Sequence, residues 1–304
     1  MKKFIKRLII IIIITLIADR AIYYIVKPFY KRATTTDEFK LNAVMNRMND
    51  PVVFMGSSRC HHNYVPSIIG DSLQTDVYNA GLWGARNIYF QYAVLCNILE
   101  RYTPQTICLE LHPVDYLQTP FSRLDKVGNL TPFINYSAGC DEVLKKAGFY
   151  YKCELSCLYR YNSDFANIFM GNLTKRSFES DKGYKALSGQ FDTKTGKTTP
   201  EEFPFAVDED KLHYLQAFID KCKEKKIQLI FLFGPMYAVE NTNIFNIPDS
   251  MAKKNGITFI NHYNLEGITG HAEYYYDFGH LNEVGAKKYS SFIASELKQY
   301  ITKK

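Results

Sequence analysis

Short apolar runs alternate with longer amphipathic segments along most of this 304-residue chain. Five runs have the length of buried strands and end near glycine, proline or polar residues: 51–55, 75–80, 106–111, 227–233 and 257–260. Apolar residues at helical spacing predict helices over 84–101, about 208–225 and 281–300. Strands that alternate with helices favour a mostly parallel sheet with helices on both faces. The pattern therefore predicts an α/β fold built on a five-stranded sheet.

Residues 118–205 interrupt this alternation. They are rich in Tyr, Phe, Asn, Ser and Gly, and residues 188–201 are polar. We interpret the segment as an insertion between the third and fourth strands, on the side of the sheet where loops build sites. The chain length fits one large α/β domain as well as two smaller domains. We expect a single domain over 31–304 that contains the insertion, preceded by a membrane anchor over 1–30.

The N-terminal segment has the composition of a membrane helix. Phe4 to Val26 is a predominantly apolar stretch of 23 residues, long enough to span a bilayer with some tilt. A cleaved signal peptide has a similar basic start and apolar centre, but no small-residue cleavage site follows Ala18. A short buried helix is a further alternative. We expect an uncleaved transmembrane helix in the cytoplasmic (inner) membrane, with Asp19 and Arg20 toward its far end and the main domain on the periplasmic side.

The net charge of the chain is concentrated in the same segment. Eight basic residues lie within 1–32 beside a single acid, whereas residues 33–304 carry 29 basic and 30 acidic groups. A nearly neutral body argues against nucleic acid as a partner, and the basic excess is a membrane-topology signal. The seven cysteines are odd in number and lack a C-x-x-C spacing. Neither a disulfide framework nor a metal site is therefore expected.

Three short motifs fall near strand ends or before the last helix, where open α/β sheets form their sites. Ser58 follows the first strand in the GSSR motif of 56–59, so its hydroxyl and N–H could face a substrate. Gly81 follows the second strand, where a backbone N–H can approach a ligand closely. Asp277 lies three residues before His280, within reach to fix the tautomer of a general base. Taken alone, each motif also fits a plain helix cap or turn.

The order of these motifs resembles the SGNH hydrolase superfamily, with Ser58 at the nucleophile position, Gly81 in the second block, and Asp277 and His280 in the last block. The segments VVFMGSSR, NAGLWG, DKGYKAL and YYYDFGHLNEVGA are similar to the membrane-anchored branch of that superfamily. This branch includes relatives of the D-alanine transfer protein of teichoic acids and of the alginate O-acetylation proteins. The resemblance covers roughly 51–116 and 206–300. It implies a three-layer, flavodoxin-like SGNH fold.

One block of the chain departs from the family pattern. SGNH enzymes usually place Gly-x-Asn-Asp after the third strand, and its asparagine donates to the oxyanion, whereas residues 110–115 read ELHPVD here. Loss of one oxyanion donor costs about 3–4 kcal/mol in related serine chemistry. Either His112 or another group takes its place, or catalysis is weak or absent. Arg59, next to Ser58, could bind an anionic group of a substrate.

The resemblance implies a triad of Ser58, His280 and Asp277, with the N–H groups of Ser58 and Gly81 as the oxyanion hole. The expected activity is transfer or hydrolysis of an acyl group, most simply acetyl, on a cell-envelope glycan, without a metal or organic cofactor. The anchor favours a transferase over an esterase. The resemblance also implies a multispanning membrane acyltransferase as the source of the acyl donor. The alternative is a non-catalytic glycan-binding or assembly subunit of an envelope polysaccharide complex, which the missing asparagine motivates.

Overall fold

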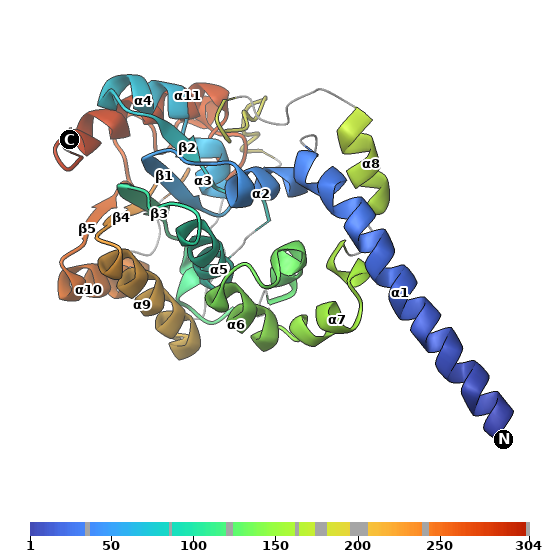
Figure 1. Ribbon diagram of the computed structural model, residues 1–304. Coiled ribbons are helices and arrows are strands. Elements are labelled where there is room, and N and C mark those ends of the chain that lie inside the picture. Colours follow the sequence, from blue (N-terminus) through green and yellow to red (C-terminus); the bar gives the residue numbers. More distant parts are fainter. Residues whose placement is uncertain are drawn as a thin grey trace.

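A five-stranded parallel sheet forms the centre of the protein (Figure 1). The computed structural model describes residues 1–33, 37–84, 87–119, 124–161, 164–173, 181–194, 206–238 and 243–301. The strands are β1 (Val52–Gly56), β2 (Val77–Asn79), β3 (Thr106–Glu110), β4 (Gln228–Phe233) and β5 (Thr258–Asn261). All neighbours pair in parallel, in the spatial order β2-β1-β3-β4-β5. This is the flavodoxin-like order, so the predicted fold class is confirmed.

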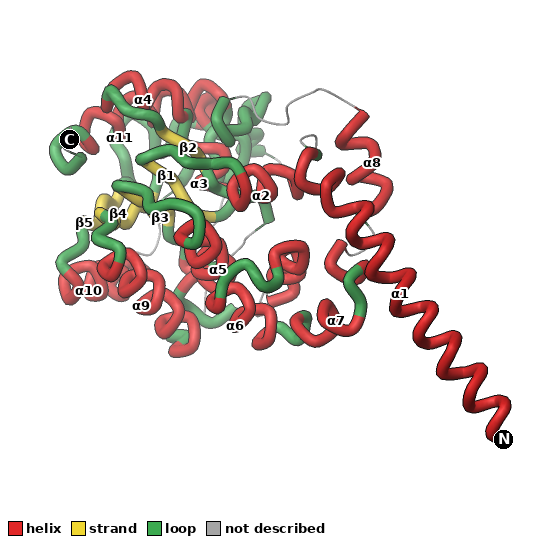
Figure 2. Tube along the Cα trace, viewed as in Figure 1, coloured by secondary structure: helices red, strands yellow, loops and turns green. Residues whose placement is uncertain are grey.

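Helices cover both faces of the sheet, as Figure 2 shows. One face carries α2 (Asp37–Asn46), α5 (Ile88–Leu99), α9 (Glu209–Glu224) and α10 (Asn246–Asn255), the last preceded by the 3-10 helix η4 (Asn243–Phe245). The other face carries α3 (Ser58–Asn63), α4 (Pro66–Leu73) and α11 (Glu283–Leu297), the last preceded by η5 (Ala272–Tyr274). Side chains alternate along β1, since Val53 and Met55 enter the first core and Val52 and Phe54 the second. The predicted strands and helices are thus present, with shifted ends.

The direction in which successive strands are added to the sheet reverses at β1. β2 lies on one side of β1, and β3 lies on the other. In sheets of this kind, ligand sites form beyond the carboxyl ends of the strands beside such a reversal. Ser58 is the first residue of α3, directly after β1. The serine motif therefore occupies the position where the topology favours a site.

The predicted insertion contributes helices to the body and a segment to the site. After η1 (Pro113–Asp115), the described part contains η2 (Leu124–Phe133), α6 (Ala138–Lys146), α7 (Tyr150–Leu155), η3 (Leu158–Tyr161) and α8 (Phe165–Leu173). Helix α6 packs against α5, and α8 packs against the N-terminal helix. Residues 181–191 instead lie beside α3, where the Lys185 carbonyl oxygen is 2.8 Å from His62 Nδ1. The rest of the predicted insertion (120–123, 162–163, 174–180 and 195–205) falls outside the described residues.

Helix α1 (Lys2–Arg32) is continuous, but its two halves have different surroundings (Figure 1). In the described chain it is the one helix long and apolar enough to cross a membrane, and a signal sequence would fit the same criteria. Its first half carries exposed apolar side chains, whereas Tyr23 and Tyr30 are buried in the same core as α5 and α6. Packing against the body thus begins well before residue 30, where the body was expected to start.

Candidate active site

Ser58 is held at a tight turn between β1 and α3. Gly56, which ends β1, has a φ of +149°, in the region that favours glycine. A Cβ atom there would lie 2.9 Å from both the Cys60 Cβ and the Glu110 carbonyl oxygen, so a larger residue would displace the turn. Ser57 is the N-cap, and α3 begins at Ser58. The Ser58 N–H therefore belongs to the first helical turn, whose amides have no intrahelical acceptor.

His280 and Asp277 reach Ser58 from the loop before α11. His280 Nε2 lies 2.8 Å from Ser58 Oγ, although the two residues are 222 positions apart. His280 Nδ1 lies 2.9 Å from each carboxylate oxygen of Asp277. Because an ionised carboxylate only accepts hydrogen bonds, Nδ1 carries the ring proton and Nε2 can accept from the serine hydroxyl. The structure thus brings the three residues of the predicted triad into one hydrogen-bonded chain.

The carboxylate of Asp277 is stabilised in its charged form. Burial alone would raise the pKa of Asp277, but the hydrogen bond and charge of His280 and two backbone N–H groups lower it below its ordinary value. These N–H groups, of Gly279 and His280, donate to Oδ1 at 2.9 and 2.8 Å. Asp277 therefore remains ionised at neutral pH, which keeps His280 in the tautomer that a general base needs.

Two asparagines hold the loop that carries His280. Asn63, at the end of α3, accepts a hydrogen bond from the Leu281 N–H at 3.0 Å. Asn282 is the N-cap of α11, and its side-chain amide donates to the Gly189 carbonyl oxygen at 2.8 Å. The loop is therefore tied both to the helix that carries Ser58 and to the segment 181–191.

An aromatic wall, formed by His62 and Trp83, lies beside His280. The Trp83 and His280 rings are nearly parallel, with 16° between their planes and 6.0 Å between their centroids. The His62 ring stands at a steep angle to both, 5.7 Å from His280 and 5.0 Å from Trp83. Trp83, the single tryptophan of the chain, is 45% exposed. It offers a flat apolar surface next to the triad on which a sugar ring or acyl chain could pack.

His62 is a neutral neighbour of the triad. The ring is fully buried, and its Nδ1 lies 2.8 Å from the Lys185 carbonyl oxygen. Burial, partly offset by that hydrogen bond and reinforced by the charges of His280 and Lys40, lowers the pKa of His62 to about 3. His62 therefore adds no second positive charge when His280 takes up a proton.

We expect His62 to make the folded protein less stable in mild acid. The unfolded ring binds a proton below its ordinary pKa of 6.5, whereas the folded protein excludes that proton down to about 3. Since the unfolded state binds more protons in this window, the free energy of unfolding falls with pH, by about 2 kcal/mol between about pH 7.5 and pH 5. Chemical denaturation at both pH values should show a smaller loss for His62→Asn than for wild type. His271→Asn, at an exposed position, controls for the loss of a histidine, and equal losses in wild type and His62→Asn would contradict the prediction.

Gly81 packs against the backbone of α3. A Cβ atom there would lie 2.4 Å from the His61 nitrogen and 2.7 Å from the Cys60 carbonyl carbon. The Gly81 N–H donates to Asn79 Oδ1 at 2.9 Å, and the Asn79 amide donates to the Cys60 carbonyl oxygen at 2.7 Å. The amide expected in the oxyanion hole is therefore engaged within the protein. The geometry supports a different reason for glycine at this position, which is the close approach of two backbone segments.

Arg59 turns into the protein rather than toward a ligand. Its side chain is 3% exposed and forms an ion pair with Glu110 at 3.0 Å. The guanidinium lies 4.3 Å from the Phe233 ring centroid, and its Nη2 donates to the Gly234 carbonyl oxygen at 2.5 Å. These contacts do not support the predicted role of Arg59 in substrate binding, because its charge is neutralised in the interior.

Glu110 joins the ends of β3 and β4 to α3. Besides the ion pair with Arg59, its carboxylate accepts hydrogen bonds from the Tyr64 hydroxyl and from the Gly234 N–H, the latter at 3.0 Å. The block that departs from the family pattern therefore begins with a buried anchor for the helix that carries Ser58.

His112 caps the 3-10 helix η1. Its Nδ1 accepts from the Val114 N–H at 3.4 Å, and its own N–H donates to the Asp115 carboxylate at 2.8 Å. These contacts give no support to His112 as a substitute oxyanion donor. No cluster of three or more His, Cys, Asp or Glu side chains among the described residues could hold a metal ion.

Three residues of the site were not anticipated from the sequence: His62, Trp83 and Glu110. A signal exists for each of them. His62 follows Ser58 by four positions, the spacing that puts two residues on one face of a helix. Trp83 lies in the loop that follows the second strand, at the same edge of the sheet. Glu110 is an acid at the end of a buried strand, which requires a partner inside the protein.

Comparison with known proteins finds only distant structural similarity to this chain. A scan against protein-family models and a search of the curated proteins both give no match. The chain is similar to a solved structure described as lipolytic, of the G-D-S-L family, from Desulfitobacterium hafniense (12% identity, 81% of this chain and 99% of the other, TM-score 0.41). It is also similar to an acetyl xylan esterase (12%, 83% and 99%, TM-score 0.41) and to a protein described as an acylhydrolase from Bacteroides fragilis (11%, 84% and 93%, TM-score 0.35). Similarity at 11–12% identity is a likeness of fold and carries no conclusion about activity.

Proposed function

We propose that this protein is a membrane-anchored serine enzyme that moves an acyl group, most simply acetyl, on an envelope glycan. The observation that carries the proposal is the chain from Ser58 through His280 to Asp277, with separations of 2.8 and 2.9 Å. A nucleophile, a base and an orienting carboxylate at such distances can activate a serine hydroxyl. The motif resemblance to the SGNH superfamily supports the same chemistry.

The proposed reaction has two steps. In the first, Ser58 Oγ attacks the acyl carbonyl carbon while its proton passes to His280 Nε2, and Asp277 stabilises the resulting imidazolium. The Ser58 N–H donates to the oxyanion. The donor oxygen then leaves with the proton from His280, and the acyl group remains as an ester on Ser58. In the second step, His280 deprotonates an acceptor hydroxyl or water, which attacks the ester carbonyl carbon. The bond to Ser58 Oγ then breaks, and His280 returns the proton to Oγ, which restores the free serine.

We favour transfer to a glycan over hydrolysis. An enzyme anchored by α1 stays beside membrane-borne donors and acceptors, and the exposed Trp83 ring, 6.0 Å from that of His280, suits a sugar. By the family resemblance, a multispanning membrane acyltransferase would deliver the acyl donor, and the main domain would lie on the periplasmic side. The proposed steps need no metal ion or organic cofactor.

A non-catalytic role in glycan binding or complex assembly is the second candidate. It is favoured by the Gly81 N–H, which donates to Asn79, and by the Arg59–Glu110 ion pair at the end of β3, where the family pattern continues to an oxyanion donor. Loss of one such donor costs about 3–4 kcal/mol, so turnover could be weak or absent on an intact fold. The 2.8 Å separation of Ser58 Oγ and His280 Nε2 weighs against this candidate.

Intact-mass spectrometry tests the proposed nucleophile. The full-length protein in detergent micelles is mixed with p-nitrophenyl acetate and quenched early. We expect one added acetyl group on wild type and none on Ser58→Ala. Ser57→Ala is the matched control, since Ser57 makes no side-chain capping hydrogen bond, and it should be acetylated like wild type. A folded wild type that is never acetylated would favour the non-catalytic subunit.

A further inference from the structure

The free part of α1 is too short to cross a bilayer. Phe4 to Ala18 gives about 15 residues, or about 22 Å of helix, against a hydrocarbon core of about 30 Å. A span that begins at Phe4 therefore continues to about Tyr24, and tilt makes the requirement longer. Contacts with the body already begin at Asp19, which bonds to Ser156 and its neighbours. The part of the body that touches this stretch consequently lies at the edge of the hydrocarbon core.

The body presents an apolar collar at this depth. We define the collar as the five exposed side chains of Leu155, Phe165, Phe169, Met170 and Leu173. They are between 37% and 72% exposed, at the end of α7 and along α8. Helices α7 and α8 flank α1 (Figure 1). The collar therefore continues the apolar surface of α1 onto the body.

Two hydrogen bonds fix the level of the collar along α1. The Arg20 guanidinium donates to the Leu155 carbonyl oxygen at 2.9 Å. The Asn172 amide, on α8, donates to the Phe29 carbonyl oxygen, also at 2.9 Å. The collar thus extends from the level of Arg20 to that of Phe29, across the end of the span.

The body supplies hydrogen-bond partners to Asp19 and Arg20, the ion pair of α1 at this depth. The Asp19 carboxylate accepts hydrogen bonds from Ser156 Oγ at 2.5 Å and from the N–H groups of Cys157 and Leu158 at 2.7 and 3.2 Å. Arg20 adds an ion pair at 2.8 Å. Because these partners replace water, the pair can lie close to lipid chains, and the body rather than snorkelling alone accounts for both charges.

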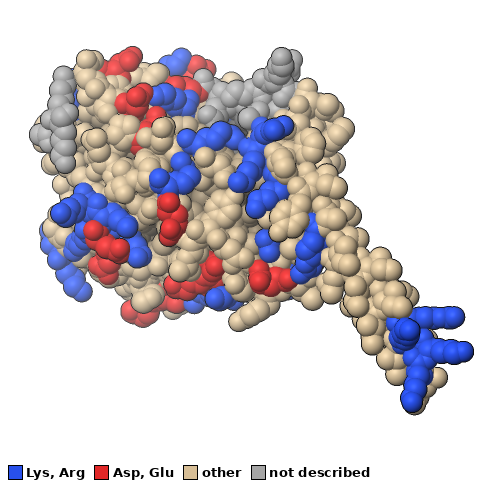
Figure 3. Space-filling view, viewed as in Figure 1, with Lys and Arg blue, Asp and Glu red and all other residues tan. Residues whose placement is uncertain are grey.

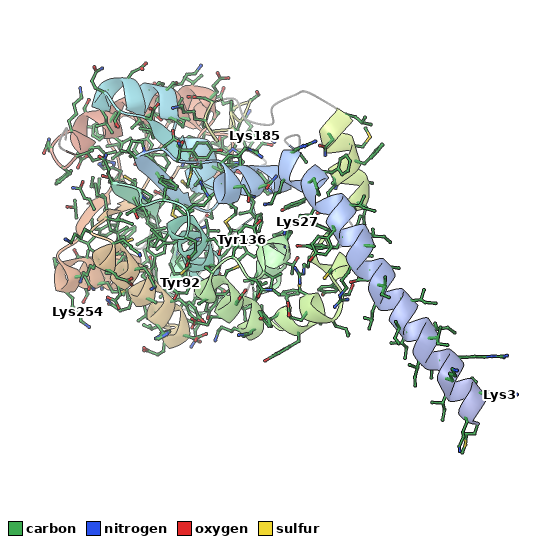
Figure 4. All side chains as sticks on the ribbon, viewed as in Figure 1. Lys3, Lys27, Tyr92, Tyr136, Lys185 and Lys254 are labelled. Carbon is green, nitrogen blue, oxygen red and sulfur yellow. The ribbon has the colours of Figure 1, made fainter. Side chains whose placement is uncertain are left out.

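The distribution of basic residues marks both ends of the span. On the face shown in Figure 3, lysine and arginine gather at the free end of α1 and the following stretch is uncharged. Figure 4 shows side chains near Lys3 projecting freely from the helix, whereas Lys27 lies where the helix meets the body. Lys27 Nζ is 5.4 Å from the Tyr23 ring centroid. Lysine and tyrosine together are typical of the headgroup level.

We infer that the collar is immersed in the leaflet on the side of the body, so that the domain rests on the lipid surface at a fixed orientation. The occupant of the collar is the bilayer, because the collar is continuous with the span and lies at the depth that the span length requires. The inference rests on the anchoring part of the proposed function and is independent of its chemistry.

Tryptophan fluorescence with brominated lipids tests the collar. In full-length protein carrying Trp83→Phe, one new tryptophan replaces Phe169, Leu173, Ile12 or Phe292, all of which are exposed. The variants are reconstituted in phosphatidylcholine liposomes with acyl chains brominated near the headgroup or near the chain end. Phe169→Trp and Leu173→Trp should lose fluorescence to bromine near the headgroup. Phe292→Trp, on α11, is the matched control and should keep its fluorescence.

Ile12→Trp, in the middle of the span, reports whether α1 is inserted. If Ile12→Trp is quenched but Phe169→Trp and Leu173→Trp are not, α1 is inserted in the bilayer and the collar is not. That result would overturn the inference and indicate that another protein covers the collar. If Ile12→Trp is not quenched, α1 does not span the bilayer, and the inference about the collar is wrong as well. Acetylation of Ser58 is measured separately, so a failure of the chemistry is distinguishable from either result.

Discussion

Asp277→Asn is expected to lower acyl-group turnover by about 10⁴-fold, although it preserves the shape of the side chain. In the wild type, Oδ1 accepts from the N–H groups of Gly279 and His280 at 2.9 and 2.8 Å, so the asparagine oxygen takes that position. The amide nitrogen then replaces Oδ2, so His280 Nδ1, which lies 2.9 Å from both oxygens, faces a donor as well as an acceptor. A donor at this position favours an unprotonated Nδ1. The ring proton moves to Nε2, and Ser58 loses its base.

Steady-state turnover of p-nitrophenyl acetate by the full-length protein in micelles measures this effect. Glu273→Gln removes an exposed acid from the same loop and should retain the wild-type rate. Circular dichroism of each variant separates lost chemistry from lost fold. If Asp277→Asn loses less than about tenfold in turnover, the carboxylate does not orient the base, and the proposed triad reduces to a serine and a histidine.

Glu110→Gln is expected to lower the free energy of unfolding by about 3–5 kcal/mol. The substitution leaves no cavity, but Arg59, which is 3% exposed, keeps its charge without the carboxylate that lies 3.0 Å away. The Gly234 N–H and the Tyr64 hydroxyl lose a charged acceptor at the same time. Since Arg59 follows Ser58 directly, the variant should also be acetylated more slowly.

A double variant separates the buried charge from the other contacts. Arg59→Met combined with Glu110→Gln removes both charges and should recover part of the lost stability, measured by chemical denaturation in micelles. Asp249→Asn breaks the exposed ion pair with Lys253 and serves as the control, because surface pairs contribute little. A loss for Glu110→Gln no larger than that of the control would mean that this ion pair does not hold α3 in place.

Much of the fold is predictable because its signals are local. β4 contains a continuous apolar run, Leu229 to Phe233, that Gly234 and the following proline end, and the sequence alone identifies it. The helix expected over 84–101 begins later, at Ile88, since Gly84 has a φ of +92° and Asn87 is the N-cap. Sheet order then follows from the family resemblance and from the packing of helices on both faces.

The sequence predicts which residues of the candidate site lie together where a topological rule connects residues that are far apart in the chain. Asp277 and His280 are neighbours in sequence, and Ser58 joins them because sites gather at the carboxyl ends of parallel strands. Their catalytic roles stay predictions. The inward orientation of the Arg59 side chain could not be predicted from the sequence, because its hydrogen-bond partner Gly234 is 175 positions away. The hydrogen bond from the Gly81 N–H to Asn79 could not be predicted either, because it depends on the side-chain rotamer of Asn79.

The packing of α1 on the body sets an order of events during synthesis. Asp19 leaves the ribosome 138 positions before its partner Cys157. At ordinary rates of translation this interval lasts on the order of 10–30 s. Throughout it, Tyr23, which ends up buried and stacked on Tyr161, lacks that covering ring. A bilayer that already holds α1 would shield the Tyr23 ring until Tyr161 is made, so the membrane would protect this part of the helix before the body does.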